Sequence, residues 1–305
     1  MPKISVVVAT YNRCESLIKT LQSIADQTGI DQADYEIIVV DNNSTDKTKE
    51  IVEGFKRAFP GNLIYLFEQR QGKTFALNKG IESTRGEIIA MTDDDCVADR
   101  NWLANIWKTF STKNIDLLAG KVIAECDGAW PEWLDKTKLH GPLAHHDKGD
   151  KYFENDDVRK ILVTGANMIF RRTSVEKFGN FRFSGRSQDT DLAYRWANLG
   201  AKIAYSPEAV VIHHNDASRL TKSYFRKWYF LGGRNNLIIF KENFFTGRSF
   251  LGIPLWVFRD LFVTLMKYLR SFLLPRENAF EHEVFLFYYL GIISGCYDLK
   301  CENLR

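Results

Sequence analysis

Residues 4–9, Ile-Ser-Val-Val-Val-Ala, begin the pattern that decides the fold of this chain. A short, continuous apolar run that is rich in valine is typical of a strand buried on both faces of a sheet. Comparable runs follow at residues 36–40, 63–67 and 87–91, and the segments between them carry apolar residues at helical spacing. This alternation of strands and helices predicts an α/β fold, in which helices cover a parallel sheet.

The middle of the chain has a different pattern. Residues 127–160 are polar and show no sustained period, and a long irregular stretch inside a compact domain is often functional. Regular structure is predicted again further on, with strands at 167–170, 202–205 and 210–213 and a helix at 189–199. From Thr221 onward the sequence is helical, aromatic and basic.

Residues 251–274 look at first like a membrane-spanning helix, but they contain four charged side chains, Arg259, Asp260, Lys267 and Arg270. Each of these would cost about 2.5–3.5 kcal/mol at the centre of a bilayer. On a helix the four fall on one side, and apolar residues such as Phe262 and Leu269 fall on the other. The segment is therefore predicted to be an amphipathic helix that lies either on a membrane or on the protein's own core.

The composition excludes several classes of protein. With 45% apolar residues and a net charge of only +3, the chain is too apolar and too nearly neutral to be disordered or to bind nucleic acid. The charge is uneven, because residues 215–305 contain 13 Lys or Arg against 8 Asp or Glu. We expect an acidic catalytic part and a basic tail that suits the inner face of a plasma membrane.

The five cysteines are scattered and form no Cys-x-x-Cys motif, which favours a reduced, cytoplasmic setting. The first residues do not have the charged and then long apolar build of a signal peptide.

Polar side chains follow the predicted strands at the points where they end. Thr10, Tyr11 and Asn12 follow the first strand, Asp41 follows the second, and residues 93–95 are three consecutive aspartates after the fourth. Ligands of parallel α/β sheets bind beyond these carboxyl ends. Two carboxylates about 4 Å apart repel by about 4 kcal/mol at an effective dielectric constant of 20, so the triplet predicts a cation, and oxygen ligands favour Mg²⁺ or Mn²⁺. A solvated turn is the simpler alternative.

These stretches resemble the motifs of family-2 inverting glycosyltransferases of the GT-A fold. The resemblance runs from about residue 3 to about residue 214, and six motifs occur in the expected order. They are Ser5–Arg13, Val39–Asp46, Gly72–Gly80, Thr92–Cys96, Thr164–Asn167 and Gln188–Arg195.

The resemblance implies a Rossmann-like, mostly parallel sheet flanked by helices in a catalytic domain at residues 1–215. Residues 1–100 would bind the nucleotide sugar, residues 101–215 the acceptor, and residues 216–305 would form a helical region. The implied reaction moves one sugar from a nucleotide-diphosphate sugar to a saccharide or lipid-linked saccharide, in the biosynthesis of surface polysaccharides or glycans.

The resemblance also implies roles for the polar residues. Asp95 would bind Mn²⁺ or Mg²⁺ directly, as part of the Asp-x-Asp motif with Asp93, and His213 would complete the metal ligands. Asp93 and Asp94 would contact the ribose and the diphosphate, and Lys73 either contacts the diphosphate or is a solvated lysine at a helix start. The nucleotide pocket would be lined by Asp41, Thr10, Tyr11 and Asn12.

Asp189 would be the general base for the acceptor hydroxyl, with Asp191 as the second candidate. The residue before the base is Gln188, where the family has a glutamate, so the acceptor or the way the base is held differs here. An N-cap role is the structural alternative for Asp189. The residues expected at the acceptor are Trp130, Trp133, Asn167 and Gln188, although tryptophan more often serves packing.

Two further questions are the choice between an enzyme and a scaffold and the number of sugars added per encounter. The Gln188 departure favours a catalytically weak homologue that acts as a scaffold in polysaccharide assembly, whereas the intact aspartate triplet favours the enzyme. Residues Arg195 and Trp196 are not preceded by the glutamine that marks processive synthases, so we expect one sugar to be added per encounter.

Overall fold

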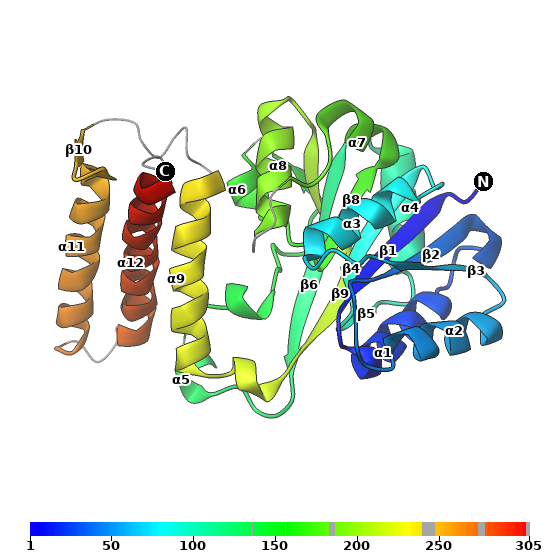
Figure 1. Ribbon diagram of the computed structural model, residues 1–305, viewed down its shortest axis with the longest axis horizontal. Helices are drawn as coiled ribbons and strands as arrows, with labels where there is room; N and C mark the ends of the chain where they lie inside the picture. The colour runs from blue at the N-terminus through cyan, green and yellow to red at the C-terminus, as the bar shows by residue number, and fades with distance from the viewer. Residues whose placement is uncertain (136, 156, 183–186, 240–247, 274–277, 303–305) are drawn as a thin grey trace. The chain divides into compact units, whose positions relative to one another are not determined.

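The computed structural model describes residues 1–135, 137–155, 157–182, 187–239, 248–273 and 278–302 (Figure 1). The chain divides into two compact units. The first, the α/β unit, comprises residues 1–125, 144–184 and 188–215. The second, the helical unit, comprises residues 126–143, 185–187 and 216–305, so it includes a segment that the sequence analysis placed in the acceptor half of the catalytic domain.

One sheet runs through the α/β unit. Its strands, in spatial order, are β3 (Asn62–Phe67), β2 (Tyr35–Asp41), β1 (Ile4–Thr10), β4 (Ile88–Asp93), β8 (Asn167–Arg171), β6 (Leu117–Cys126), β9 (Ile203–Asn215) and β5 (Cys96–Ala98), and β7 (Phe153–Glu154) pairs with β9. The first four of these strands are parallel. The pairs β4–β8, β6–β8, β5–β9 and β7–β9 are antiparallel.

The predicted α/β fold is confirmed, with two differences in detail. The sheet is mixed, because the parallel pattern that the sequence predicts holds for β1 to β4 only. The strands predicted at 202–205 and 210–213 form one strand, β9. Pro207 lies within β9, between the residues that pair with β7 and those that pair with β5.

Helices cover both faces of this sheet because the side chains of each strand alternate between faces. Val6 and Val8 of β1 pack with α1 (Cys14–Ala25) and α4 (Trp102–Thr112) on one face. Val7 packs with α3 (Lys73–Glu82) and α8 (Gln188–Asn198) on the other. The remaining helices of this unit are α2 (Thr48–Ala58), α6 (Val158–Ile161) and α7 (Arg172–Phe178).

The helical unit contains α5 (Glu132–Asp135), α9 (Lys222–Ile239), α11 (Leu255–Ser271), α12 (Ala279–Glu302) and the short strands β10 (Ser249–Phe250) and β11 (Ile253–Pro254). Helix α12 packs against both α9 and α11 (Figure 1). Glycines allow α9 and α12 to approach closely, since a Cβ atom on Gly233 would lie 2.0 Å from the carbonyl oxygen of Tyr288. A Cβ atom on Gly291 would lie 1.9 Å from that of Phe230.

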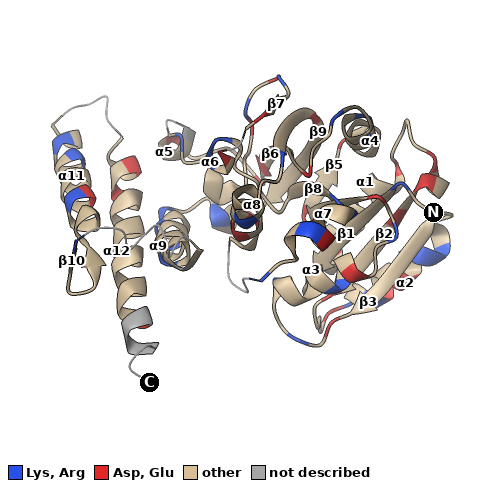
Figure 2. Ribbon diagram, turned by 90° about the horizontal axis from the view of Figure 1, so that it is seen from above, with Lys and Arg blue, Asp and Glu red and all other residues tan. Residues whose placement is uncertain are grey.

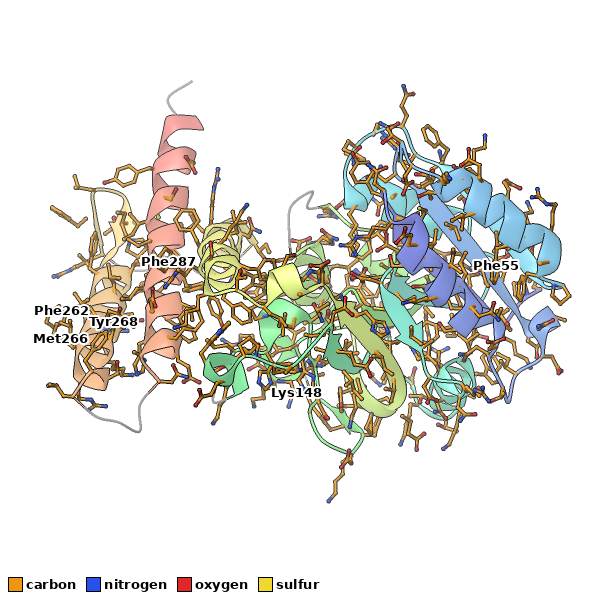
Figure 3. The ribbon with its side chains drawn as sticks, turned by 90° about the horizontal axis from the view of Figure 1, so that it is seen from below. Phe55, Lys148, Phe262, Met266, Tyr268 and Phe287 are labelled. Carbon is orange, nitrogen blue, oxygen red and sulfur yellow. The ribbon has the colours of Figure 1, made fainter. Side chains whose placement is uncertain are left out.

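Helix α11 keeps much of its apolar surface exposed. It packs inward through residues such as Val257 and Ser271, whereas Phe262 and Met266 lie on its side away from α12 (Figure 3). Lysine and arginine residues also lie on this helix (Figure 2). Within the described part of the chain, no helix is both long enough and apolar enough to cross a bilayer.

Candidate active site

The carboxyl ends of β1, β2 and β4 bring the first group of predicted residues together. Thr10 ends β1 opposite Asp41, the last residue of β2, and Ala9 is paired with Asp93, the last residue of β4 (Figure 1). Parallel strands in register end at the same edge of the sheet, so the polar residues that follow them collect there. We call this edge, with residues 10–13, 41–44 and 93–95, the carboxyl edge.

The three aspartates at the end of β4 are paired with two basic side chains. The Lys73 ammonium, at the first turn of α3, donates a hydrogen bond to Asp93 Oδ1. The Arg13 guanidinium, in the loop after β1, lies 3.2 Å from Asp94 Oδ1 and also pairs with Asp95. The sequence predicts that a metal ion offsets the repulsion among the aspartates. In the structure, Arg13 and Lys73 offset part of this repulsion.

The environment of these groups shifts their ionisation. Burial raises the pKa of Asp94 to about 6, with Asp95 adding to the increase and Arg13 opposing it. Burial would lower the pKa of Lys73, but the charge and hydrogen bond of Asp93 outweigh it and raise the pKa above its ordinary value. Burial would likewise raise the pKa of Asp93, and Lys73 reverses this. Lys73 and Asp93 thus stay charged at neutral pH.

Hydrogen bonds fix the loops after β1 and β2 to one another. The Asn12 side chain accepts a hydrogen bond from the Thr45 backbone N–H at 2.7 Å, and the Ser44 hydroxyl accepts one from the Asn12 N–H at 2.9 Å. Asp41 is buried and accepts hydrogen bonds from the Ser44 N–H and the Tyr65 hydroxyl, each at 2.8 Å. The pocket residues predicted from the sequence therefore share one connected loop structure, with Tyr11 exposed beside it.

Two of the three predicted metal ligands lie together. His213 Nε2, on β9, is 3.3 Å from Asp95 Oδ1. A carboxylate oxygen and an imidazole nitrogen are ligands that Mn²⁺ accepts, so these two residues fit a divalent cation. Asp93, the third predicted ligand, is instead engaged by Lys73.

Asp189 is the second residue of α8 and lies close enough to Lys73 for the two charges to interact. Its Oδ2 accepts a hydrogen bond from the Gly165 N–H and its Oδ1 accepts one from the Thr190 N–H, each at 2.8 Å. Burial raises the pKa of Asp189, although these hydrogen bonds and Lys73 oppose the shift. A raised pKa makes a carboxylate a stronger base.

Asp191, the second predicted base, points back along its own helix, where its Oδ2 accepts from Arg195 Nε at 3.0 Å. The two candidates therefore differ in what holds them: Asp189 is held by backbone N–H groups, whereas Asp191 is neutralised by an arginine.

The residues predicted at the acceptor belong to both units. Asn167 has no exposed surface, and its amide group bonds to the carbonyls of Lys121 and Ala209 and to the indole of Trp102. This position does not fit a contact with an acceptor, because a completely buried and fully bonded side chain has no free face. Gln188 is half-buried at the start of α8.

Both predicted tryptophans belong to the helical unit. Trp133 packs edge to face on Phe280 and Phe225, with ring centroids 4.8 and 5.1 Å apart, and Trp130 meets His140 at 5.4 Å. The indole of Trp133 thus has a packing role of its own, as the structural alternative supposed.

Sequence reasoning missed several residues of the carboxyl edge. Arg13 belongs to a quoted motif, but its pairing with the aspartates across 81 residues leaves no local signal. Asn42 joins the loop after β2 to the loop before α3, since its side chain donates to the Arg70 carbonyl at 2.7 Å and accepts from the Gly72 N–H at 2.8 Å. Cys96 lies beside Asp95 and His213.

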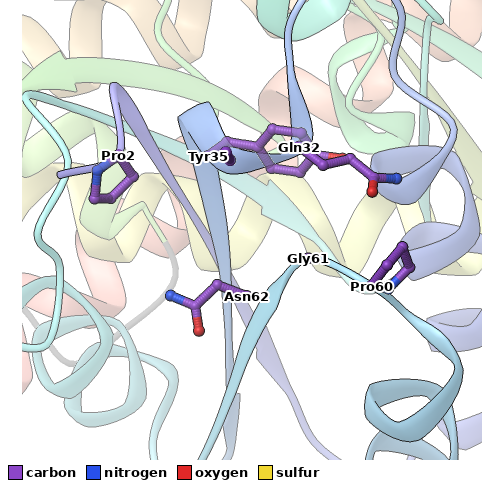
Figure 4. Close-up of a pocket in the computed structure, with 7 residues that line it drawn as sticks. Pro2, Gln32, Tyr35, Pro60, Gly61 and Asn62 are labelled. Atoms are coloured by element: carbon purple, nitrogen blue, oxygen red, sulfur yellow. The ribbon is translucent and has the colours of Figure 1, made fainter.

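A pocket at the opposite edge of the sheet lacks such chemistry. It lies at the amino ends of β1, β2 and β3 (Figure 4), and none of its lining residues is charged: Pro2, Gln32, Ala33, Tyr35, Pro60, Gly61 and Asn62. The carboxyl edge is therefore the better candidate for catalysis.

Known proteins resemble this chain over most of its length. The family model described as "Glycosyl transferase family 2" matches residues 5–179. The glycosyltransferase AglE of Haloferax volcanii is 38% identical over 261 residues, covering 84% of this chain and 80% of that protein. The succinoglycan biosynthesis protein ExoM of Rhizobium meliloti is 27% identical over 303 residues, covering 97% and 94%.

A solved structure shares the fold. The mannosyltransferase PcManGT of Pyrobaculum calidifontis, in complex with GDP-Man and Mn²⁺, superimposes with a TM-score of 0.63 at 18% identity, over 97% of this chain and 88% of that chain. The architecture is thus the GT-A fold.

Proposed function

Because the chain belongs to glycosyl transferase family 2 and is therefore a glycosyltransferase, we propose that it moves one sugar from a nucleotide-diphosphate sugar to a hydroxyl group of a saccharide or lipid-linked saccharide, with inversion. Such a reaction places negative charge on the departing nucleoside diphosphate, and it needs a base that takes the proton of the attacking hydroxyl. Groups suited to both tasks lie at the carboxyl edge and at the start of α8.

The charge balance of this site carries the proposal. Asp93, Asp94, Asp95 and Asp189 bring four negative charges when ionised, and Arg13 and Lys73 bring two positive ones, which leaves a net charge of −2. One divalent cation, Mn²⁺ or Mg²⁺, balances that charge, and Asp95 and His213 are the residues that would hold it. The cation supplies a Lewis acid for the charge of the diphosphate.

The basic residues have a second task when the donor is bound. Lys73 would contact the diphosphate, since its ammonium lies at the carboxyl edge and stays protonated. Asp93 and Asp94 would share the ribose and diphosphate contacts. The loops tied together by Asn12 would hold the nucleoside between Thr10, Tyr11 and Asp41.

Asp189 is the proposed general base. Its carboxylate is oriented by two backbone N–H groups, and it lies near Lys73 and therefore near the diphosphate site. Asp191 is the weaker candidate because its carboxylate is already occupied by the ion pair with the Arg195 guanidinium on the same helix.

The proposed acceptor is a growing surface saccharide. One relative is named as a succinoglycan biosynthesis protein, which supports a polysaccharide or glycan product. Gln188, next to the base, would contact the acceptor. The half-buried Trp130 and Trp133, which belong to the helical unit, are separate candidates for stacking on a sugar ring. Asn167 is omitted, because it is fully buried and fully bonded.

Peripheral contact with an anionic membrane, at its cytoplasmic face, would bring the enzyme to a lipid-linked acceptor. The support comes from α11, where Phe262 is 61% exposed and Leu269 is 50% exposed, close to Lys267 and Arg270. Exposed apolar residues beside basic ones are typical of helices that lie in a membrane interface.

Release of nucleoside diphosphate from a panel of UDP, GDP, dTDP and CDP sugars tests the proposed activity. With Mn²⁺ and purified protein we expect slow hydrolysis of one donor class, lost on chelation and in Asp95→Ala. The matched control is Asp31→Ala, which removes an exposed aspartate before β2, and it should keep full activity. Absence of any metal-dependent nucleotide binding would favour the scaffold alternative.

The size of the product tests whether one sugar is added per encounter. With the donor found in that panel and a saccharide acceptor, we expect products one sugar longer than the acceptor. Long homopolymers formed from a single acceptor would show that the enzyme is processive.

A further inference from the structure

Three side chains of different chemistry meet at the end of β4 and the start of β5. One ligand atom each of Asp95, Cys96 and His213 can be chosen so that all three atoms lie within 4.8 Å of one another. The proposed function uses Asp95 and His213 for a hard divalent cation and gives Cys96 no task.

Strand pairing explains why Cys96 and His213 are neighbours. β5 pairs antiparallel with β9, and Cys96 stands directly opposite His213 in that pairing. Residues directly opposite each other in an antiparallel pair present their side chains on the same face, with Cβ atoms about 4.5–5.5 Å apart. The next residue, His214, donates its backbone N–H to the Asp95 carbonyl at 2.9 Å, which closes the ladder beside the cluster.

The cluster is held in place rather than assembled from mobile parts. Cys96 is 1% exposed and His213 is 4% exposed, and both lie within the sheet. Asp95 directly precedes β5, in the two-residue turn after β4, and its Oδ1 is 3.3 Å from His213 Nε2. Three ligand atoms in such fixed positions need little ordering to close around an ion.

A sulfur ligand changes which metal ions the site prefers. Carboxylate and imidazole alone accept Mn²⁺, whereas a cysteine thiolate favours thiophilic ions such as Zn²⁺ and Co²⁺. Three protein ligands with one open position are the arrangement of many zinc sites. The thiol loses its proton to solvent when it binds such an ion.

We propose that Asp95, Cys96 and His213 bind one thiophilic divalent ion of the Zn²⁺ class without any nucleotide. The inference rests on the proposed function in one respect: two of these residues are the ligands assigned there to Mn²⁺ or Mg²⁺. The two ions cannot share those ligands, so a bound Zn²⁺ excludes the hard cation from the site. Zinc is then a competitive inhibitor with respect to Mn²⁺.

Co²⁺ is the probe that tests this site, because a thiolate bound to Co²⁺ gives a charge-transfer band in the near ultraviolet. We expect the band when Co²⁺ is added to the full chain in the absence of nucleotide. It should disappear in Cys96→Ser and Cys96→Ala and persist in Cys14→Ser and Cys126→Ser, which change cysteines outside the cluster. Zinc affinity should fall by at least about tenfold in the Cys96 variants. Even substitution of a residue that only hydrogen-bonds to a metal ligand lowers metal affinity by about 10–100-fold.

Two results would overturn the proposal: no charge-transfer band in the unaltered protein, or a band that survives in both Cys96 variants. If one Cys96 variant fails to fold, shown by its thermal melt, the other variant and His213→Gln decide, because loss of the imidazole also weakens Co²⁺ binding. Nucleotide-dependent Mn²⁺ binding is measured separately. If Mn²⁺ binds with nucleotide but the cobalt band is absent, this inference is refuted and the proposed function stands. If the cobalt band is present but Mn²⁺ does not bind with nucleotide, the proposed function is refuted and this inference stands.

Discussion

The carboxyl edge of the sheet and the outer face of α11 depart from ordinary burial in opposite directions. At the carboxyl edge, Asp94 and its neighbours keep charged groups away from water, whereas on α11 Phe262 and Leu269 expose apolar groups to water. Each arrangement costs free energy in the isolated chain. Under the proposed function, the difference predicts which kind of partner would complete each region: a cation with a diphosphate at the edge, and an apolar, anionic surface at the helix.

Asp95→Ala should have one of the two largest effects on activity. Activity should fall by about 10³-fold, because the cation loses a ligand at the point where charge develops on the diphosphate. The free energy of unfolding should change little, because the repulsion removed within the aspartate cluster offsets the lost ion pair with Arg13. Initial rates and chemical denaturation measure the two quantities. A variant that loses stability in step with activity would show that Asp95 is structural and would end the contrast with α11.

Asp189→Asn should lower kcat by about 10²–10⁴-fold, the usual contribution of a general base, with the KM for the donor nearly unchanged. The matched variant Asp191→Asn loses the pair with Arg195 and should act mainly on stability. Steady-state kinetics with both variants distinguish the two aspartates. Equal losses of kcat would mean that the base is not Asp189 alone.

A buried carboxylate outside the candidate active site serves as the comparison for the aspartates of the carboxyl edge. Glu36 has no exposed surface and accepts hydrogen bonds from Arg85 Nη2 at 2.6 Å and Nε at 2.9 Å. Arg85→Ala should cost about 2 kcal/mol of unfolding free energy, less than a fully buried pair because Arg85 is itself half exposed. Denaturant titration measures this. If Arg85→Ala is as stable as the unaltered protein, the buried Glu36 carboxylate does not need an ion-pair partner within the protein.

Substitutions on α11 should change stability least. Phe262→Glu and Met266→Glu should each alter the free energy of unfolding by less than about 0.5 kcal/mol, since both side chains are exposed. Sedimentation with anionic vesicles should weaken by about tenfold, because an inserted apolar side chain contributes about 1.5–3 kcal/mol. Ile18→Glu, on an exposed position of α1, is the matched control. Equal sedimentation of all variants would remove α11 as the membrane surface.

The sequence predicts the parallel half of the sheet well because each buried strand is a local pattern. It also places Thr10, Asp41 and Asp93 at one edge, because parallel strands end together. Pairings between distant residues have no local signal. The ion pairs of Arg13 and Lys73 and the position of Cys96 opposite His213 therefore emerge only in the structure.

The acceptor side was harder to predict for the same reason. Asn167 occurs in a family motif, yet its amide ties β8 to the carbonyls of Lys121 and Ala209 inside the sheet. Trp133 lies in the short helix α5, and its packing partners, Phe225 and Phe280, lie far along the chain. Neither membership in a motif, as for Asn167, nor residue type, as for Trp133, distinguishes a ligand contact from a packing contact.

Electron paramagnetic resonance of Mn²⁺ tests the central claim most directly. When protein and the preferred nucleoside diphosphate are added together, the signal of free Mn²⁺ should fall, and it should recover in Asp95→Ala but not in Asp31→Ala. If the nucleotide binds equally well in the presence of chelator, and the Mn²⁺ signal is the same with the unaltered protein and with Asp95→Ala, the carboxyl edge is not a metal–diphosphate site.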